Sequence, residues 1–122
     1  MLEVDGKDIY MTRGDSGVIQ VIPKVKDCNN ERVRYTFEEG DRIIFRLKLK
    51  ADDASAIICE KECTIDLEHN KAFLKLEPED TEHCEFKKHR YEFELITADD
   101  FHCTFIEDQP FTIGKELETH VD

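Results

Sequence analysis

The chain has 122 residues, the length of one ordinary domain, and 39% of them are hydrophobic, which is enough for a single packed core. Its 29 acidic and 17 basic side chains give a formal net charge of −12, which argues against a surface for nucleic acid or for anionic lipid. No run of 18 apolar residues occurs, so the sequence predicts no transmembrane helix.

Alternation of apolar and polar residues predicts short antiparallel strands along most of the chain, because one face of each strand then covers a core. In chain order, the expected strands are Asp8–Thr12, Val18–Val25, Arg42–Lys50, Ala56–Glu60, Cys63–Glu68, Lys71–Leu76, Tyr91–Leu95, Phe101–Ile106 and Pro110–Ile113. Strands of this length and spacing predict an all-β sandwich of seven to nine strands, formed by a single domain over residues 1–122.

The longest alternating run, Arg42–Lys50, separates two faces. Ile43, Phe45, Leu47 and Leu49 share the face expected to be buried, and Ile44, Arg46, Lys48 and Lys50 share a mostly solvated face. The same argument applied to the later runs gives the predicted core: Ile43, Phe45, Leu47, Leu74, Leu76, Tyr91, Phe93 and Leu95.

At most one or two helical turns are expected. Asp53–Ile58 is predicted to start a short helix with Asp53 as its N-cap, and Pro78–Thr81 is predicted to form one turn with proline at its first position. The polar segment 115–122 is expected to fray. His69-Asn70 and Asp99-Asp100 each separate two alternating runs, so we expect both pairs at hairpin tips.

Several segments in fixed order resemble a known family. They are Tyr10–Gly17 with its Thr12-Arg13-Gly14-Asp15, Phe37–Lys48 with its strand Gly40–Lys48, Lys61, the turn Leu76–Thr81, the strand Tyr91–Leu95 and the closing Phe111–Ile113. Together they resemble the immunoglobulin-like N-terminal domain of the phage baseplate upper protein, found among phage and prophage proteins of Gram-positive bacteria. The resemblance covers nearly the whole chain.

The resemblance implies an immunoglobulin-like sandwich that serves as a non-enzymatic structural or interaction module of a phage tail or baseplate region. Its partners would then be other phage tail or baseplate proteins, and no catalytic residues carry over from the family. It also implies synthesis in the cytoplasm of a bacterial host, with incorporation into the virion left open. The segment Met1–Asp5 lacks the basic and apolar regions of a signal peptide, which agrees with that location.

Five cysteines at irregular spacing, Cys28, Cys59, Cys63, Cys84 and Cys103, are expected to be reduced thiols. Cys59 and Cys63, with His83, Cys84 and His89 downstream, invite a zinc interpretation. Four residues of strand span about 13 Å, whereas two sulfurs on one zinc lie only about 4 Å apart. We therefore expect no metal or other cofactor, and whether Cys59, Cys63 and Cys84 approach one another is left open.

No catalytic constellation is expected. The acidic pairs Asp52-Asp53, Glu79-Asp80 and Asp99-Asp100 lack the spacing of a calcium loop and are predicted to be solvated turns. The two serines, Ser16 and Ser55, stand in no nucleophile motif, and adjacent His102 and Cys103 on a strand would point to opposite faces. Arg13-Gly14-Asp15 matches the tripeptide that integrins recognise, but glycine and aspartate favour turns for backbone reasons alone.

The alternative function is a ligand-binding sandwich of the carbohydrate-binding kind. The absence of tryptophan argues against it, because sugar rings stack on flat aromatic side chains. The charged outward positions favour a monomer or weak oligomer in isolation. We expect contact with partners through an edge strand or through the ends of the sandwich, where the turns Arg13–Gly17 and Pro78–Thr81 lie.

Overall fold

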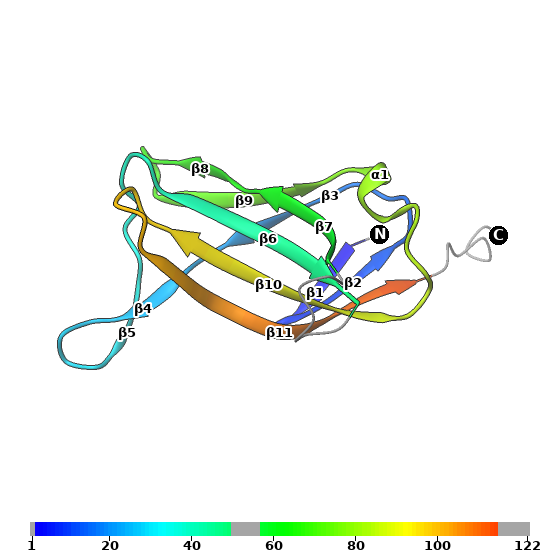
Figure 1. The fold of residues 1–122 in the computed structure, drawn as a ribbon, viewed down its shortest axis with the longest axis horizontal. Helices are drawn as coiled ribbons and strands as arrows, with labels where there is room; N and C mark the ends of the chain where they lie inside the picture. Colours follow the sequence, from blue (N-terminus) through cyan, green and yellow to red (C-terminus); the bar gives the residue numbers. More distant parts are fainter. Residues whose placement is uncertain (1, 50–56, 115–122) are drawn as a thin grey trace.

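The computed structural model describes residues 2–49 and 57–114, which form two facing sheets, a separate hairpin and one helical turn (Figure 1). The larger sheet has the order β1 (Leu2–Asp5), β2 (Asp8–Thr12), β11 (His102–Gly114), β10 (Lys88–Ile96), β6 (Arg42–Lys48) and β7 (Ile57–Glu62). The smaller sheet has the order β3 (Gly17–Val21), β9 (Lys71–Leu76) and β8 (Thr64–Asp66). The hairpin pairs β4 (Lys24–Lys26) with β5 (Arg32–Arg34), and α1 is Pro78–Thr81.

The strand order confirms the predicted all-β, immunoglobulin-like sandwich. Strands β6, β10 and β11 are neighbours in one sheet, and β3, β9 and β8 form the other, so the chain crosses repeatedly between sheets. The predicted turn Pro78–Thr81 is also confirmed. Its amino end is closed by Asp80, whose Oδ2 accepts a hydrogen bond from the Glu77 backbone N–H at 2.7 Å.

Strand number and direction differ from the prediction. The described residues hold eleven strands, and β1 and β5, with four and three residues, are too short for their alternation to stand out in the sequence. The run Val18–Val25 is divided at Pro23, since proline has no backbone N–H to offer a ladder. The purely antiparallel expectation is wrong at β2 and β11, which pair in parallel. That pair joins the two ends of the sequence, where local alternation carries no information on strand direction.

Two further expectations change at the ends of elements. The runs Phe101–Ile106 and Pro110–Ile113 are parts of one strand, β11, whose register against β10 shifts twice between Tyr91 and Glu94. Of the helix expected over Asp53–Ile58, residues 53–56 lie outside the described residues, and the last two positions belong to strand β7 instead. The tail 115–122 also lies outside the described residues.

The core is an aromatic and aliphatic cluster between the sheets, and all eight predicted core residues belong to it. Phe45 lies at its centre, with ring centroids 5.2 Å from Phe93, 6.0 Å from Phe111 and 6.1 Å from Tyr91. Such tilted aromatic contacts add to the free energy of burial. The core also includes Ile9 and Met11, which tie β2 to the sandwich.

Two residues of the run 42–50 do not follow the predicted faces. Leu49 is exposed, because β6 ends at Lys48 after a register shift against β7. Ile44 is buried on the outer face, where its neighbours in register are Glu62 and Glu94. The long side chains of such charged residues can cover an apolar neighbour while their ends stay in water.

Replacing Phe45 by alanine should lower the free energy of unfolding by about 3–5 kcal/mol, because it removes a fully buried ring from the centre of the core. Urea denaturation of the purified chain measures this. Phe101→Ala is the matched control, since that ring is 67% exposed, and it should change the free energy of unfolding by no more than about 0.5 kcal/mol. A loss below about 1 kcal/mol for Phe45→Ala would contradict the assignment of the core.

Candidate interaction surface

The β4–β5 hairpin is the segment that stands apart from both sheets. It projects from the end of the molecule opposite α1 and pairs with no third strand of the described residues (Figure 1). Its tip follows from the sequence: Asp27 Oδ1 accepts hydrogen bonds from the backbone N–H groups of Asn29 and Glu31, both at 2.9 Å, and Asn30 adopts a left-handed φ of 62°. Asparagine tolerates that conformation better than most residues.

One face of the hairpin carries only positive charge. In register, Lys24 lies opposite Arg34 and Lys26 lies opposite Arg32, so all four side chains emerge on the same face, with Val25 and Val33 on the other. Like charges directly opposite each other destabilise a strand pair. The side chains of Lys24, Lys26 and Arg32 make no ion pair or hydrogen bond with any residue that the structure describes, and the Arg34 side chain donates to the backbone carbonyl of Asn70.

A cleft opens at the base of this hairpin, with a volume of about 330 Å³. The lining residues are Lys7, Ile22, Lys24, Arg32, Phe105 and Ile106. The cleft therefore has three cationic groups, an apolar floor and no described carboxylate in its lining. The lining of the cleft is therefore positively charged, whereas the chain as a whole has a net charge of −12.

On the outer face of the larger sheet, by contrast, Arg46 and Lys48 are paired with carboxylates. Arg46 contacts carboxylate oxygens of Glu60 at 2.7 Å, Glu92 at 3.0 Å and Glu94 at 2.9 Å, and Lys48 contacts Glu92 at 2.8 Å. The same alternation that placed Phe45 inward placed these charges outward on β6 and β10. The two cations of this network are neutralised by its carboxylates, so they offer an anionic partner little electrostatic attraction.

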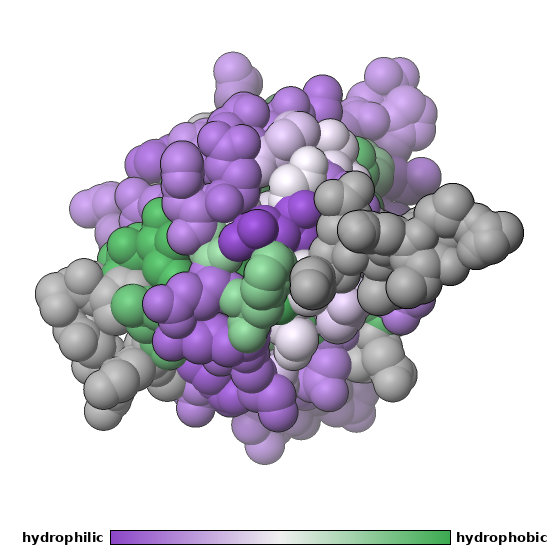
Figure 2. All heavy atoms as spheres, turned by 90° about the vertical axis from the view of Figure 1, so that its right-hand side faces the viewer, coloured by the Kyte–Doolittle hydropathy of each residue, from purple (hydrophilic) through white to green (hydrophobic). Residues whose placement is uncertain are grey.

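The Arg13-Gly14-Asp15 turn contacts its own protein. The Arg13 guanidinium lies 4.0 Å from the centroid of the Phe86 ring, and the Gly14 backbone N–H donates to Thr81 Oγ1 at 2.9 Å. Thr81 is the last residue of α1, so the turn is fastened to that helix. Figure 2 shows that this end of the molecule is mainly hydrophilic, with apolar side chains in separate patches. An arginine held on an aromatic ring is poorly placed for adhesion.

The five cysteines are all free thiols. Cys63 and Cys84 are buried and Cys59 is partly buried, and burial raises the pKa of the Cys59 thiol to about 11 and that of Cys63 to about 12. A thiol with such a pKa is protonated at neutral pH and is a poor nucleophile. In the described part of the chain these cysteines join no set of three ligand atoms within 4.8 Å. The expectation of a metal-free protein stays a prediction.

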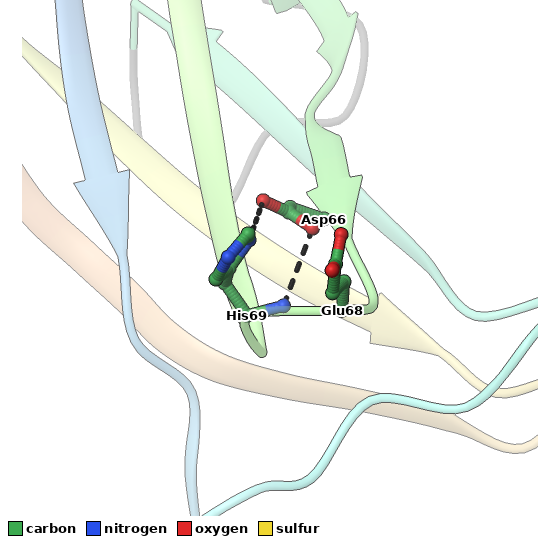
Figure 3. Close-up of side chains that lie close together, drawn as sticks. All are labelled: Asp66, Glu68 and His69. Carbon is green, nitrogen blue, oxygen red and sulfur yellow. Dashed lines mark hydrogen bonds and ion pairs between the residues drawn. The ribbon is translucent and has the colours of Figure 1, made fainter.

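Another trio does converge, on the turn between β8 and β9. Asp66, Glu68 and His69 are the one group in the described residues whose potential ligand atoms lie within 4.8 Å of one another (Figure 3). Asp66 is already bonded to His69 at both oxygens, to Nδ1 at 2.8 Å and to the backbone N–H at 3.3 Å, and the His69 bond lowers the Asp66 pKa. All three are largely solvated, so this geometry is that of a hydrogen-bonded hairpin tip. The sequence predicted the tip at His69-Asn70 but missed Asp66.

The acidic pairs and the serines that the sequence analysis considered form no catalytic group among the described residues. Of the pair Glu79-Asp80, Asp80 caps α1 and binds Lys61 Nζ at 2.6 Å. The hairpin tip Asp99-Asp100 is confirmed between β10 and β11, and Asp99 accepts a hydrogen bond from Thr97 Oγ1 at 2.5 Å. Asp52, Asp53 and Ser55 lie outside the described residues, and Ser16 is exposed.

The histidines His89 and His102 differ in burial: His89 is buried and His102 is exposed. His102 is exposed and binds Glu94, whereas Cys103 beside it is partly buried, as expected for neighbours on a strand. His89 is fully buried, and its Nε2 lies 3.1 Å from the Glu85 carbonyl oxygen. His89 belongs to no group of three potential metal ligands among the described residues.

Comparison of the chain with protein families and with curated proteins finds no match. Among the described residues, no helix is both long and apolar enough to cross a membrane. What the structure defines is the class, an all-β immunoglobulin-like sandwich with a projecting cationic hairpin.

The contact of His102 with Glu94 should appear as a pH dependence. Hydrogen bonds to Glu94 and Asp100 raise the pKa of His102, so its contribution to stability is complete below about 6.5, the usual histidine pKa, and is lost as pH rises through the folded-state value. Partial burial opposes ionisation of Glu94, but the bonds from His102 and Arg46 outweigh it and lower the Glu94 pKa. NMR titration of the ring should give a His102 pKa above the ordinary value. Glu94→Gln should lower it, and Asp100→Asn should lower it less; no change with Glu94→Gln would contradict the contact.

The like-charge pairs of the hairpin give a second prediction. Lys26→Glu replaces repulsion from Arg32 by attraction, a difference of roughly 0.2–1 kcal/mol for a cross-strand pair. Amide exchange at Asp27 and Tyr35, whose N–H groups close the hairpin at 2.9 Å each, should slow by up to about fivefold. Lys26→Gln removes the repulsion without adding attraction and should give a smaller effect. Faster exchange in Lys26→Glu would show that the pair does not destabilise the hairpin.

Proposed function

We propose that this chain is a non-enzymatic interaction module that acts by protein–protein contact. One observation carries the proposal: the β4–β5 hairpin extends away from both sheets and presents a face of four cations. A two-stranded hairpin with no third strand is marginal on its own, and its opposed like charges weaken it further. An anionic partner surface would offset that repulsion. In the isolated chain the four cations only lower the stability of the hairpin.

The setting we propose is a phage or prophage tail or baseplate region, with other tail or baseplate proteins as partners. Support comes from the ordered segments that resemble the baseplate upper protein domain. Two of these segments contain elements of the fold described above. The Gly40–Lys48 segment contains strand β6, and the Leu76–Thr81 segment contains α1. The Arg13 turn is bonded to the same α1.

The ligand-binding alternative has less support. A sugar platform requires exposed flat aromatic side chains, and the two aromatic rings that are prominently exposed in the described residues are Phe86 at 46% and Phe101 at 67%. The Arg13 guanidinium already covers one face of Phe86. Phe101 lies beside the tip of the β10–β11 hairpin and lines none of three clefts of about 300–330 Å³ among the described residues.

Size-exclusion chromatography of a lysate tests the proposed function. The chain, carrying a small affinity tag, is expressed from its own locus while the prophage is induced. It should elute in a complex of several tail proteins identified by mass spectrometry, and the same tagged chain expressed alone should elute as a monomer or weak oligomer. A chain that stays at the size of 14.3 kDa throughout induction would overturn the assignment to tail or baseplate.

A further inference from the structure

The cleft between the β4–β5 hairpin and β11 combines two properties that single out a ligand class. Lys24 and Arg32 reach it from the two hairpin strands, and Lys7 reaches it from the turn between β1 and β2. Ile22, Phe105 and Ile106 supply apolar surface between these cations. The volume of about 330 Å³ lies at the low end of the range for ligand sites.

The apolar floor is backed by the core. The Phe105 ring stacks on Phe93 with centroids 6.0 Å apart, and Phe105 and Ile106 both pack against the buried cluster. Two consecutive residues of a regular strand would point to opposite faces. The register shift of β11 next to Phe93 brings both of them to the cleft, as a bulge does when it redirects a side chain. The floor is therefore formed before any ligand arrives.

We infer that this cleft binds a short acidic segment of a partner polypeptide, which inserts one apolar side chain against Phe105 and Ile106 while its carboxylates contact Lys7, Lys24 and Arg32. The inference rests on the proposed function and names the partner's chemistry. Carboxylates bonded to lysine and arginine form charge-assisted hydrogen bonds, which are stronger than neutral ones. The inserted side chain supplies the hydrophobic part of the contact.

The charge of the whole molecule favours a short peptide over a nucleic acid. A polyanion longer than the cleft would continue over a surface that carries the remaining acidic residues of a chain at −12. A segment with a few carboxylates ends within reach of the hairpin cations. The apolar floor also distinguishes a peptide from inorganic phosphate, which has no group to cover it.

The same contact would stabilise the hairpin. A carboxylate placed near Lys24 and Arg32 offsets the repulsion that Arg34 and Lys26 exert on them across the strands. A ligand that binds the closed hairpin and not the opened one shifts the opening equilibrium toward the closed form. Bound ligand should therefore slow amide exchange at Asp27 and Tyr35, two residues outside the cleft lining.

The experiment is an NMR titration of the full ¹⁵N-labelled chain with the capped pentapeptide Asp-Glu-Phe-Glu-Asp. We expect saturable shifts at the amides of the cleft residues and slower exchange at Asp27 and Tyr35. Affinity should fall at least fivefold when serine replaces the peptide's phenylalanine, and the neutral peptide Asn-Gln-Phe-Gln-Asn should give no saturable shifts. Raising the salt concentration should weaken binding of the acidic peptide, because the charges at the rim are exposed.

Paired charge reversals locate the site. Lys24→Glu with Arg32→Glu should lower peptide affinity at least tenfold, and each substitution places an opposite charge across the hairpin, so the fold is retained. Lys75→Glu with Lys88→Glu changes the net charge equally at exposed positions that do not line the cleft, and should change affinity less than twofold. Equal binding by both double variants would overturn the inference.

Three other results would also overturn it. A ten-nucleotide oligothymidylate that binds the cleft more tightly than the peptide would assign it to nucleic acid, and inorganic phosphate that reproduces the peptide's shifts would reduce it to an anion site. Shifts at the cleft on raising the concentration of the protein alone would make a second copy the occupant. If the chain enters a tail complex but the peptide leaves the cleft unshifted, the inference fails alone; if the peptide binds and no such complex forms, the tail assignment fails alone.

Discussion

The packing of Phe45 against the aromatic rings of the neighbouring strands is the contact on which the rest of the structure depends. Phe45 lies in the middle of β6, its ring meets Phe93 and Tyr91 from β10, and Phe111 from β11 completes the cluster. With period two along each strand, fixing these rings inward also fixes which side chains face outward. A slip of one residue in β6 would bury Arg46 and expose Phe45. The ion network of the outer face is thus a consequence of the core.

Charge is distributed unevenly over this fold. On the larger sheet, Arg46 and Lys48 lie among glutamates of β7 and β10 and are neutralised by them. On the β4–β5 hairpin, four cations face one another with no acidic strand beside them. The outer face of the larger sheet and the hairpin face therefore differ in their capacity to bind an anionic partner. The paired face resists association, since a partner would have to break existing contacts, whereas the hairpin face gains from any anion that approaches.

Several turns rely on aspartate and asparagine in place of glycine. Between Gly40 and Gly114 the chain has no glycine, and among the described residues of that stretch the left-handed positions are Asn70, Asp100 and Asp108, with φ between 52° and 68°. These residues hold left-handed backbone at lower cost than most, because short polar side chains bond to nearby backbone groups. Asp108 lies next to the register shifts of β11, where Arg90 binds its side chain at 2.7 Å. That irregular stretch of β11 also positions the floor of the cleft.

The sequence by itself determined the class of fold, the eight predicted core residues and two of the hairpin tips, because alternation and turn chemistry are local properties. In the runs around Phe45, Leu74 and Phe93, the alternation within each run shows which side chains face inward, and the pair Asp99-Asp100 is enough to indicate a turn. Only the tertiary structure decided the parallel pairing of β2 with β11 and the burial of Ile44. It also decided the register shifts of β11, which bring the side chains of Phe105 and Ile106 to the same cleft. The candidate site was likewise beyond local patterns: Lys7, Lys24 and Phe105 are far apart in the chain, and they line one cleft because three separate elements meet there.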